Sequence, residues 1–161
     1  MMNAKPILLA DDDPLGVELT LEALADFHLA NEIQIVRDGE EALDYLYRRG
    51  PFATRVQGNP ALILLDLKMP KVDGLEVLRQ IRVEQGLRLI PVVMLTSSRE
   101  EEDVIASYAS GANSYVVKPL DFVEFVQVIK SLGVFWVMLN TPPPSSVTST
   151  KQREESVHFS S

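Results

Sequence analysis

Five short apolar runs alternate along this chain with longer stretches of helical periodicity. The runs are PILLA (6–10), EIQIVRD (32–38), ALILLDL (61–67), IPVVMLTSS (90–98) and SYVVKP (114–119). EIQIVRD alternates between apolar and polar residues and predicts a strand, whereas ALILLDL is a continuous apolar run, which is typical of a central parallel strand buried on both faces. Strands that alternate with helices form such a sheet through right-handed crossovers. The sequence therefore predicts an α/β fold, with five parallel strands and helices on both faces.

Five helices are expected, one after each strand, at 14–28, 39–50, 73–86, 99–112 and 121–139. Their apolar side chains recur every three or four residues, which places them on one face of a helix. The side chains expected to face inward are Val17, Leu21, Leu24 and His28 in the first helix, Val77, Leu78 and Ile81 in the third, and Val104, Ile105 and Tyr108 in the fourth.

The overall composition narrows the class of partner. The 161 residues carry a formal net charge of −8, whereas nucleic-acid-binding domains usually present a basic face. The chain has no cysteine, which excludes disulfides and thiol nucleophiles and fits a cytoplasmic protein. The start MMNAKP does not resemble a secretory signal. We therefore expect a cytoplasmic protein that binds neither nucleic acid nor a membrane.

The composition changes near residue 140. Residues 1–139 are expected to form one domain, and residues 140–161, NTPPPSSVTSTKQREESVHFSS, read as a disordered polar tail. Just before the tail, GVFWVML (133–139) is richer in large apolar groups than a solvent-facing helix end should be, yet it is too short to cross a bilayer. It either packs on its own domain or forms a homodimer contact, and we favour the homodimer.

Polar residues follow four of the five strands. In a parallel sheet the carboxyl ends of the strands share one edge, where binding sites of open α/β sheets lie. A charged residue inside the apolar run LLDL is unfavourable unless it is paired or metal-bound, so Asp66 is the strongest candidate. The residues expected to converge are Asp11, Asp12 and Asp13 after the first strand, Asp66 at the third, Thr96 and Ser97 at the fourth, and Lys118 at the fifth.

The three consecutive aspartates could be an ordinary solvated loop, but this set of residue types also supports phosphoryl transfer. Carboxylates bind Mg²⁺ (or Mn²⁺), which would offset the mutual repulsion of the aspartates. A carboxylate can also act as a nucleophile and become an aspartyl phosphate. A lysine ammonium and a threonine hydroxyl can bind phosphoryl oxygens. Positioning and charge neutralisation of this kind are what phosphoryl transfer requires.

Four segments together, LLADDDP (8–14), LLDLKMPKVDG (64–74), VVMLTSS (92–98) and GANSYVVKP (111–119), resemble the receiver domain of two-component response regulators. The resemblance covers about residues 5–133 and implies a flavodoxin-like sheet with strand order 2-1-3-4-5. It implies that Asp66 is the phosphoacceptor, in a protein that assists its own phosphorylation and dephosphorylation without being an enzyme. The implied ligands of Mg²⁺ are Asp11, Asp12, Asp66 and the backbone carbonyl of Lys68.

The same resemblance assigns further roles. Thr96 would be the switch hydroxyl, Lys118 the phosphate-contacting lysine and Tyr115 a mobile aromatic switch residue. A cis bond is implied between Lys118 and Pro119. Asp13 is then better interpreted as the N-cap of the first helix than as a ligand. Lys68 and Ser98 occupy positions that tune dephosphorylation in this family, and a lysine there cannot orient a water as a carboxylate or amide would.

A narrower resemblance concerns the small single-domain regulators that partner phytochromes. It rests on the long segment between YLYRRG and ALILLDL, on the stretch 88–113 and on the ending SLGVFWVML (131–139). It implies a sensor histidine kinase, specifically a phytochrome, as the phosphodonor, and often a dimer. Output would then be protein–protein interaction or phosphorelay.

Two other functions remain open at this point. One is a receiver-like binding module that works without phosphorylation. The other is a Mg²⁺-dependent phosphatase with an aspartate nucleophile, which typically needs a second aspartate two residues after the first. Lys68 occupies that position and argues against the phosphatase.

Overall fold

The sheet determines where every functional side chain of this chain lies. A computed structural model describes residues 5–25, 32–55, 58–97, 99–118, 123–124 and 127–128. Its strands are β1 (Ile7–Ala10), β2 (Ile33–Val36), β3 (Leu62–Leu65), β4 (Val92–Thr96) and β5 (Ser114–Val117). They form one parallel sheet in the order β2-β1-β3-β4-β5. The predicted fold class and strand order are confirmed.

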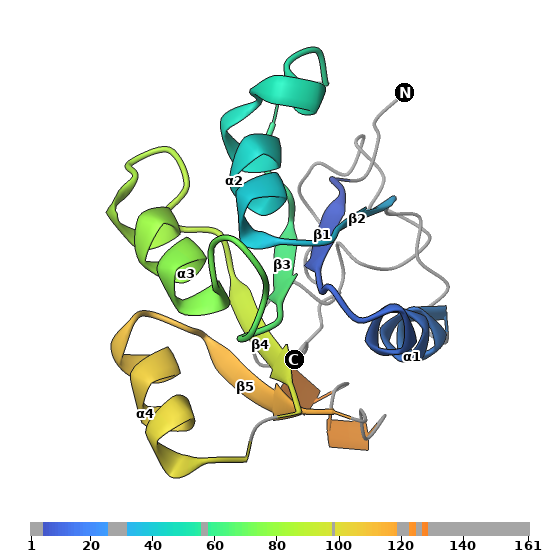
Figure 1. Ribbon diagram of the computed structural model, residues 1–161, viewed down its shortest axis with the longest axis vertical. Coiled ribbons are helices and arrows are strands. Elements are labelled where there is room, and N and C mark those ends of the chain that lie inside the picture. The colour runs from blue at the N-terminus through green and yellow to red at the C-terminus, as the bar shows by residue number, and fades with distance from the viewer. Residues whose placement is uncertain are drawn as a thin grey trace, which may run out of the picture.

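The helices cover both faces of this sheet (Figure 1). They are α1 (Pro14–Ala25), α2 (Gly39–Tyr47), α3 (Gly74–Val83) and α4 (Glu101–Ala109), with a short 3-10 turn η1 at Gly50–Phe52. Helix α1 lies on one face, and α2 and α3 lie on the other. Asp38 and Asp73 cap α2 and α3 by accepting the backbone N–H groups of Glu41 and Glu76, which the termini of helices otherwise leave unpaired.

Alternate residues of each strand enter two separate cores, as the pleat of a strand requires. Under α2 and α3 the core includes Leu8, Ile63, Leu65, Met94 and the helix residues Val77, Leu78 and Ile81. Under α1 it includes Ile7, Leu9, Leu64, Val93, Val17 and Leu24, with Val128 packed against it. The strand residues named here are at most 1% exposed, and burying one such aliphatic side chain contributes about 1.5–3 kcal/mol.

Helix α4 differs from its prediction. Ile105 and Tyr108 are 59% and 49% exposed rather than inward, and Val104 is only half-buried. The buried residue of this helix is the small Ser107. The helix is turned so that Asp103 also lies partly inward, where it pairs with Lys68 at 4.0 Å. Periodicity identified the apolar stripe correctly, but it could not show whether the sheet covers that stripe.

Arg82 joins three segments at the amino ends of β4 and β5. Its Nε donates to the Gly111 carbonyl at 2.8 Å, and its Nη1 donates to the carbonyls of Ile90 at 2.7 Å and Arg88 at 3.0 Å. Its Nη2 donates to Asn113 Oδ1 at 2.7 Å. Every donor nitrogen of the guanidinium therefore has an acceptor that carries no charge.

Several predictions concern residues outside the described ranges. These are the last helix apart from 123–124 and 127–128, the segment 133–139, the tail 140–161, and His28, Ser98 and Pro119. Among the described residues, the structure has no helix with the length and apolar character needed to span a bilayer.

Candidate functional site

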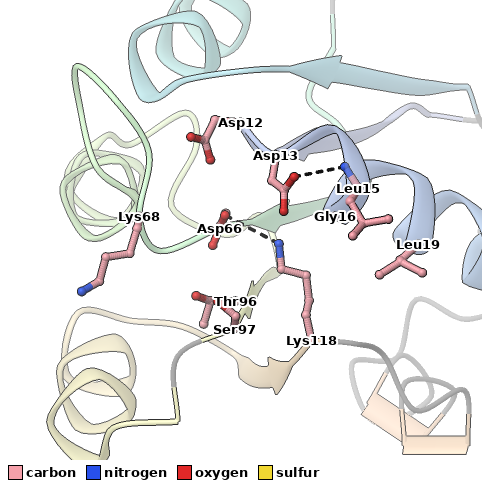
Figure 2. Close-up of a pocket in the computed structure, with 10 residues that line it drawn as sticks. All are labelled: Asp12, Asp13, Leu15, Gly16, Leu19, Asp66, Lys68, Thr96, Ser97 and Lys118. Atoms are coloured by element: carbon pink, nitrogen blue, oxygen red, sulfur yellow. Dashed lines mark hydrogen bonds and ion pairs between the residues drawn. The ribbon is translucent and has the colours of Figure 1, made fainter.

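The predicted polar residues meet in a pocket at the carboxyl edge of the sheet (Figure 2). Its volume is about 360 Å³. The strands bring the residues there through their backbones: the Asp11 N–H donates to the Val36 carbonyl, the Asp66 N–H to Ala10 and the Lys118 N–H to Thr96. The site residues thus continue the hydrogen-bonded ladder by one step. The lining residues are Asp12, Asp13, Leu15, Gly16, Leu19, Asp66, Lys68, Thr96, Ser97 and Lys118.

Asp11 is held at both carboxylate oxygens and is 1% exposed. Its Oδ1 accepts the backbone N–H of Asp13 at 3.0 Å, and its Oδ2 accepts Lys118 Nζ at 2.6 Å. Asp13 in turn accepts the Leu15 N–H at 3.1 Å through its side chain, which is the N-cap arrangement at the start of α1. The predicted N-cap role of Asp13 is confirmed.

Three carboxylates and one ammonium form a cluster at this pocket, which Asp12, Asp66 and Lys118 line and against which the buried Asp11 lies. Oxygen atoms of Asp11, Asp12 and Asp66 lie within 4.8 Å of one another. Lys118 Nζ is 2.6 Å from Asp11 Oδ2 and 3.6 Å from Asp66 Oδ2. Lys68 has a side chain that is 73% exposed and points away from the cluster, toward Asp103. The cluster keeps an excess of negative charge and offers only hard oxygen donors, which fits Mg²⁺ or Mn²⁺.

Burial raises the pKa of Asp66 to about 6 from its ordinary value of 3.8. The charge of Lys118 lowers this pKa, the charge and hydrogen bond of Asp11 raise it, and a hydrogen bond with Thr96 lowers it. The carboxylate is thus destabilised by desolvation and by its neighbouring carboxylate. A strongly perturbed acid in a pocket is typical of a functional site.

The two predicted switch residues lie at different places. Thr96 is 2% exposed and lines the pocket beside Asp66. Tyr115 lies on β5, is half-buried and packs against the core under α2 and α3. The pocket lining therefore includes Thr96 but not Tyr115.

Helix α1 contributes lining residues that the sequence reading missed. Leu15, Gly16 and Leu19 come from its first two turns. Leu15 is 59% exposed, although it is a large apolar residue in the first turn of the helix. The sequence did offer one indication of a special role for Gly16. A glycine within a predicted helix is less favourable than alanine.

Comparison with known proteins identifies a family to which this chain is similar. The family model "Response regulator receiver domain" matches residues 7–130. Response regulator Rcp1 of Synechocystis sp. is 38% identical over 139 residues, which are 86% of this chain and 93% of that protein. The solved structure of its Mn²⁺-bound form has a TM-score of 0.69, covering 87% of this chain and 99% of that one.

Two further solved structures are similar. The bacteriophytochrome response regulator RtBRR is 60% identical with a TM-score of 0.77, covering 89% of this chain and 87% of that one. The phosphorylated cyanobacterial phytochrome response regulator RcpA is 39% identical with a TM-score of 0.70, covering 87% of this chain and 99% of that one.

Proposed function

Because the chain belongs to the response regulator receiver domain family, we propose that Asp66 is its phosphoacceptor and that a sensor histidine kinase is the donor. The observation that carries the proposal is the convergence of Asp12, Asp66, Thr96 and Lys118 in one pocket, with Asp11 buried against Asp66 and Lys118. Each has the chemistry that its proposed role requires. Proteins of this family are generally phosphorylated switches rather than enzymes, and this chain assists its own aspartyl phosphorylation.

The chemical step is a phosphoryl transfer between two side chains. An Asp66 carboxylate oxygen bonds to phosphorus as the bond from phosphorus to the kinase histidine nitrogen breaks, and that nitrogen keeps the electron pair. Lys118, already 3.6 Å from Asp66 Oδ2, contacts a phosphoryl oxygen, and the Thr96 hydroxyl donates to another. Asp11, Asp12, Asp66 and the Lys68 carbonyl would hold Mg²⁺ or Mn²⁺, which would supply charge neutralisation for the phosphoryl oxygens.

The output is a shift between two surface states. Thr96 contacts the phosphoryl group, and Tyr115 changes its packing against the core. These two changes alter the surface around α4 and β5. A partner that binds the two states with different affinity then reads the change. The exposed Ile105 and Tyr108 belong to this surface. The output is protein–protein binding or phosphorelay.

The identity of the donor rests on the relatives. RtBRR is named for a bacteriophytochrome and RcpA for a phytochrome, so a phytochrome histidine kinase is proposed for this chain. We further propose a cytoplasmic receiver domain at 1–139, a polar tail at 140–161 and a homodimer contact at 133–139. Sedimentation at high micromolar concentration, with and without a phosphoryl analogue, tests the homodimer. A monomer under both conditions contradicts it.

Transfer from a kinase tests the function itself. A bacteriophytochrome kinase labelled on its histidine should pass the label to the wild-type chain and to Asp44→Asn, a control aspartate that pairs with Arg49 outside the pocket. Asp66→Asn should accept none. If Asp66→Asn keeps full partner regulation, a phosphorylation-independent binding module replaces the switch. Turnover of a small phosphomonoester would instead indicate the phosphatase.

A further inference from the structure

Gly16 lies in the first turn of α1, where it is buried and lines the pocket. A glycine within a helix costs about 1 kcal/mol relative to alanine. Its φ is not in the left-handed range, so the backbone itself would accept alanine. The reason for glycine must therefore be sought in the space beside its Cα.

That space is filled by the Asp11–Lys118 ion pair. A Cβ built on Gly16 would lie 2.5 Å from Asp11 Oδ2 and 2.7 Å from Lys118 Nζ. Both separations are far below a van der Waals contact between such atoms. Figure 2 shows the Lys118 side chain rising between Asp66 and the start of α1 to reach this point. The ion pair and a side chain at position 16 cannot share the observed geometry.

The position of Lys118 matters because the ammonium lies against two of the three clustered carboxylates. A divalent cation bound to Asp11 and Asp66 must share these oxygens with the ammonium or displace it. We propose that Gly16 is a positioning residue, which admits Lys118 to Asp11 and thereby makes the ammonium an internal competitor of the divalent cation. The proposal rests on the function proposed above, and it adds that Gly16 and Lys118 set the affinity of the site for the divalent cation.

A methyl group at position 16 displaces both partners of this ion pair, and Lys118 moves further than Asp11. Asp11 is 1% exposed and is fixed through Oδ1 by the Asp13 N–H. Lys118 Nζ is the end of a long side chain that can withdraw into the pocket. Gly16→Ala therefore breaks the 2.6 Å contact, turns the Asp11 carboxyl only about its Oδ1 anchor and strengthens divalent cation binding.

Calorimetric titration with MgCl₂ in the absence of phosphodonor tests this proposal. The variants are Gly16→Ala, Lys118→Met and their combination, with Gly86→Ala as the matched control because a Cβ there meets nothing within 4 Å. Gly16→Ala should bind Mg²⁺ about three- to ten-fold more tightly than wild type, within the range for coupled neighbouring groups. Lys118→Met should bind at least as tightly as Gly16→Ala, and Gly86→Ala should equal wild type.

The combined variant, Gly16→Ala with Lys118→Met, shows whether Gly16 affects Mg²⁺ binding through Lys118 or by steric contact with the site itself. If Gly16 acts through Lys118, Gly16→Ala has no effect on Mg²⁺ affinity in the Lys118→Met background. An equal effect in both backgrounds, or unchanged or weaker binding in Gly16→Ala, overturns the proposal. Unchanged binding in Lys118→Met overturns it even if Gly16→Ala fails to fold. Wild-type protein that neither binds Mg²⁺ nor accepts phosphoryl groups would contradict the proposed function instead.

Discussion

Two groups of charged side chains, each at least partly buried, lie at opposite ends of the same sheet and are stabilised in different ways. At the amino end, the Arg82 guanidinium donates to three carbonyls and one side-chain amide oxygen. At the carboxyl end, Asp11, Asp12 and Asp66 crowd together with the Lys118 ammonium among them. One end has a full set of neutral acceptors, and the other keeps excess negative charge.

The contrast shows how a single fold separates stability from function. A charge that is saturated by fixed backbone groups contributes stability and has no reason to exchange partners. A cluster whose charges are only partly balanced is unfavourable by itself, but it can bind an external cation and then a phosphoryl group. Perturbing each end should therefore change different observables.

The largest effect on stability is expected at the amino end. Arg82→Met removes four hydrogen bonds, and should lower the free energy of unfolding by roughly 3 kcal/mol in urea titrations. Mg²⁺ affinity should not change, because the guanidinium lies at the other end of the sheet. A change in metal affinity would contradict the separation of the two ends.

The next largest effect on the free energy of unfolding is expected from Mg²⁺, which should bind only at the carboxyl end of the sheet. At a Mg²⁺ concentration 100-fold above its Kd, the free energy of unfolding should rise by about 2.7 kcal/mol. The increment should be the same in Arg82→Met and should disappear in Asp11→Asn. An increment that survives in Asp11→Asn would place the metal elsewhere.

A smaller effect should appear in the pH dependence of the metal-free protein. The folded pKa of Asp66, about 6, lies above its ordinary value of 3.8, so the folded state binds this proton more tightly than the unfolded state does. The contribution of Asp66 to stability is therefore complete below pH 4 and is lost as pH rises through 6. At pH 7.5 the free energy of unfolding of Asp66→Asn should exceed that of wild type by about 2 kcal/mol, because solvent screening in the open pocket reduces the roughly 3 kcal/mol that this shift implies.

The difference between these two unfolding curves is the informative quantity, since other groups titrate in both proteins. It should shrink toward zero between pH 6 and pH 4. A difference that grows on acidification would mean that Asp66 has a lowered pKa, which the burial of this carboxyl opposes.

The smallest effect is expected on α4. Ile105→Ser should change the free energy of unfolding by less than about 0.5 kcal/mol, because this side chain is mostly exposed. The buried Leu78→Ala should lower it by about 2–5 kcal/mol. If Ile105→Ser lowered the free energy of unfolding by a similar amount, Ile105 would have to face inward, as periodicity predicted.

Much of this arrangement could be predicted from the sequence, because local patterns determine it. Apolar runs and helix caps predict the strands and helices, and the shared edge of a parallel sheet predicts that Asp11, Asp66, Thr96 and Lys118 meet. What failed depends on tertiary packing. The rotation of α4 about its axis, which exposes Ile105 and Tyr108, has no signature in the spacing of its apolar residues.

Two other features were not predicted for a related reason. Arg82 bonds to groups up to 31 residues away, and its acceptors are mostly backbone carbonyls, which carry no sequence signal. The role of Gly16 depends on the absence of a side chain 2.5 Å from an aspartate oxygen. Neither the contacts of Arg82 nor the close approach at Gly16 can be inferred before the fold is known.

The cluster at the carboxyl end of the sheet is proposed to accept a phosphoryl group on Asp66. Intact mass after incubation with acetyl phosphate, with Mg²⁺ or with EDTA, tests this proposal for wild type, Asp66→Asn and the control Asp44→Asn. We expect a single phosphoryl adduct in wild type and Asp44→Asn, formed only with Mg²⁺ and absent in Asp66→Asn. An adduct that persists in Asp66→Asn, or wild-type protein that binds Mg²⁺ but forms no adduct, would contradict the proposal.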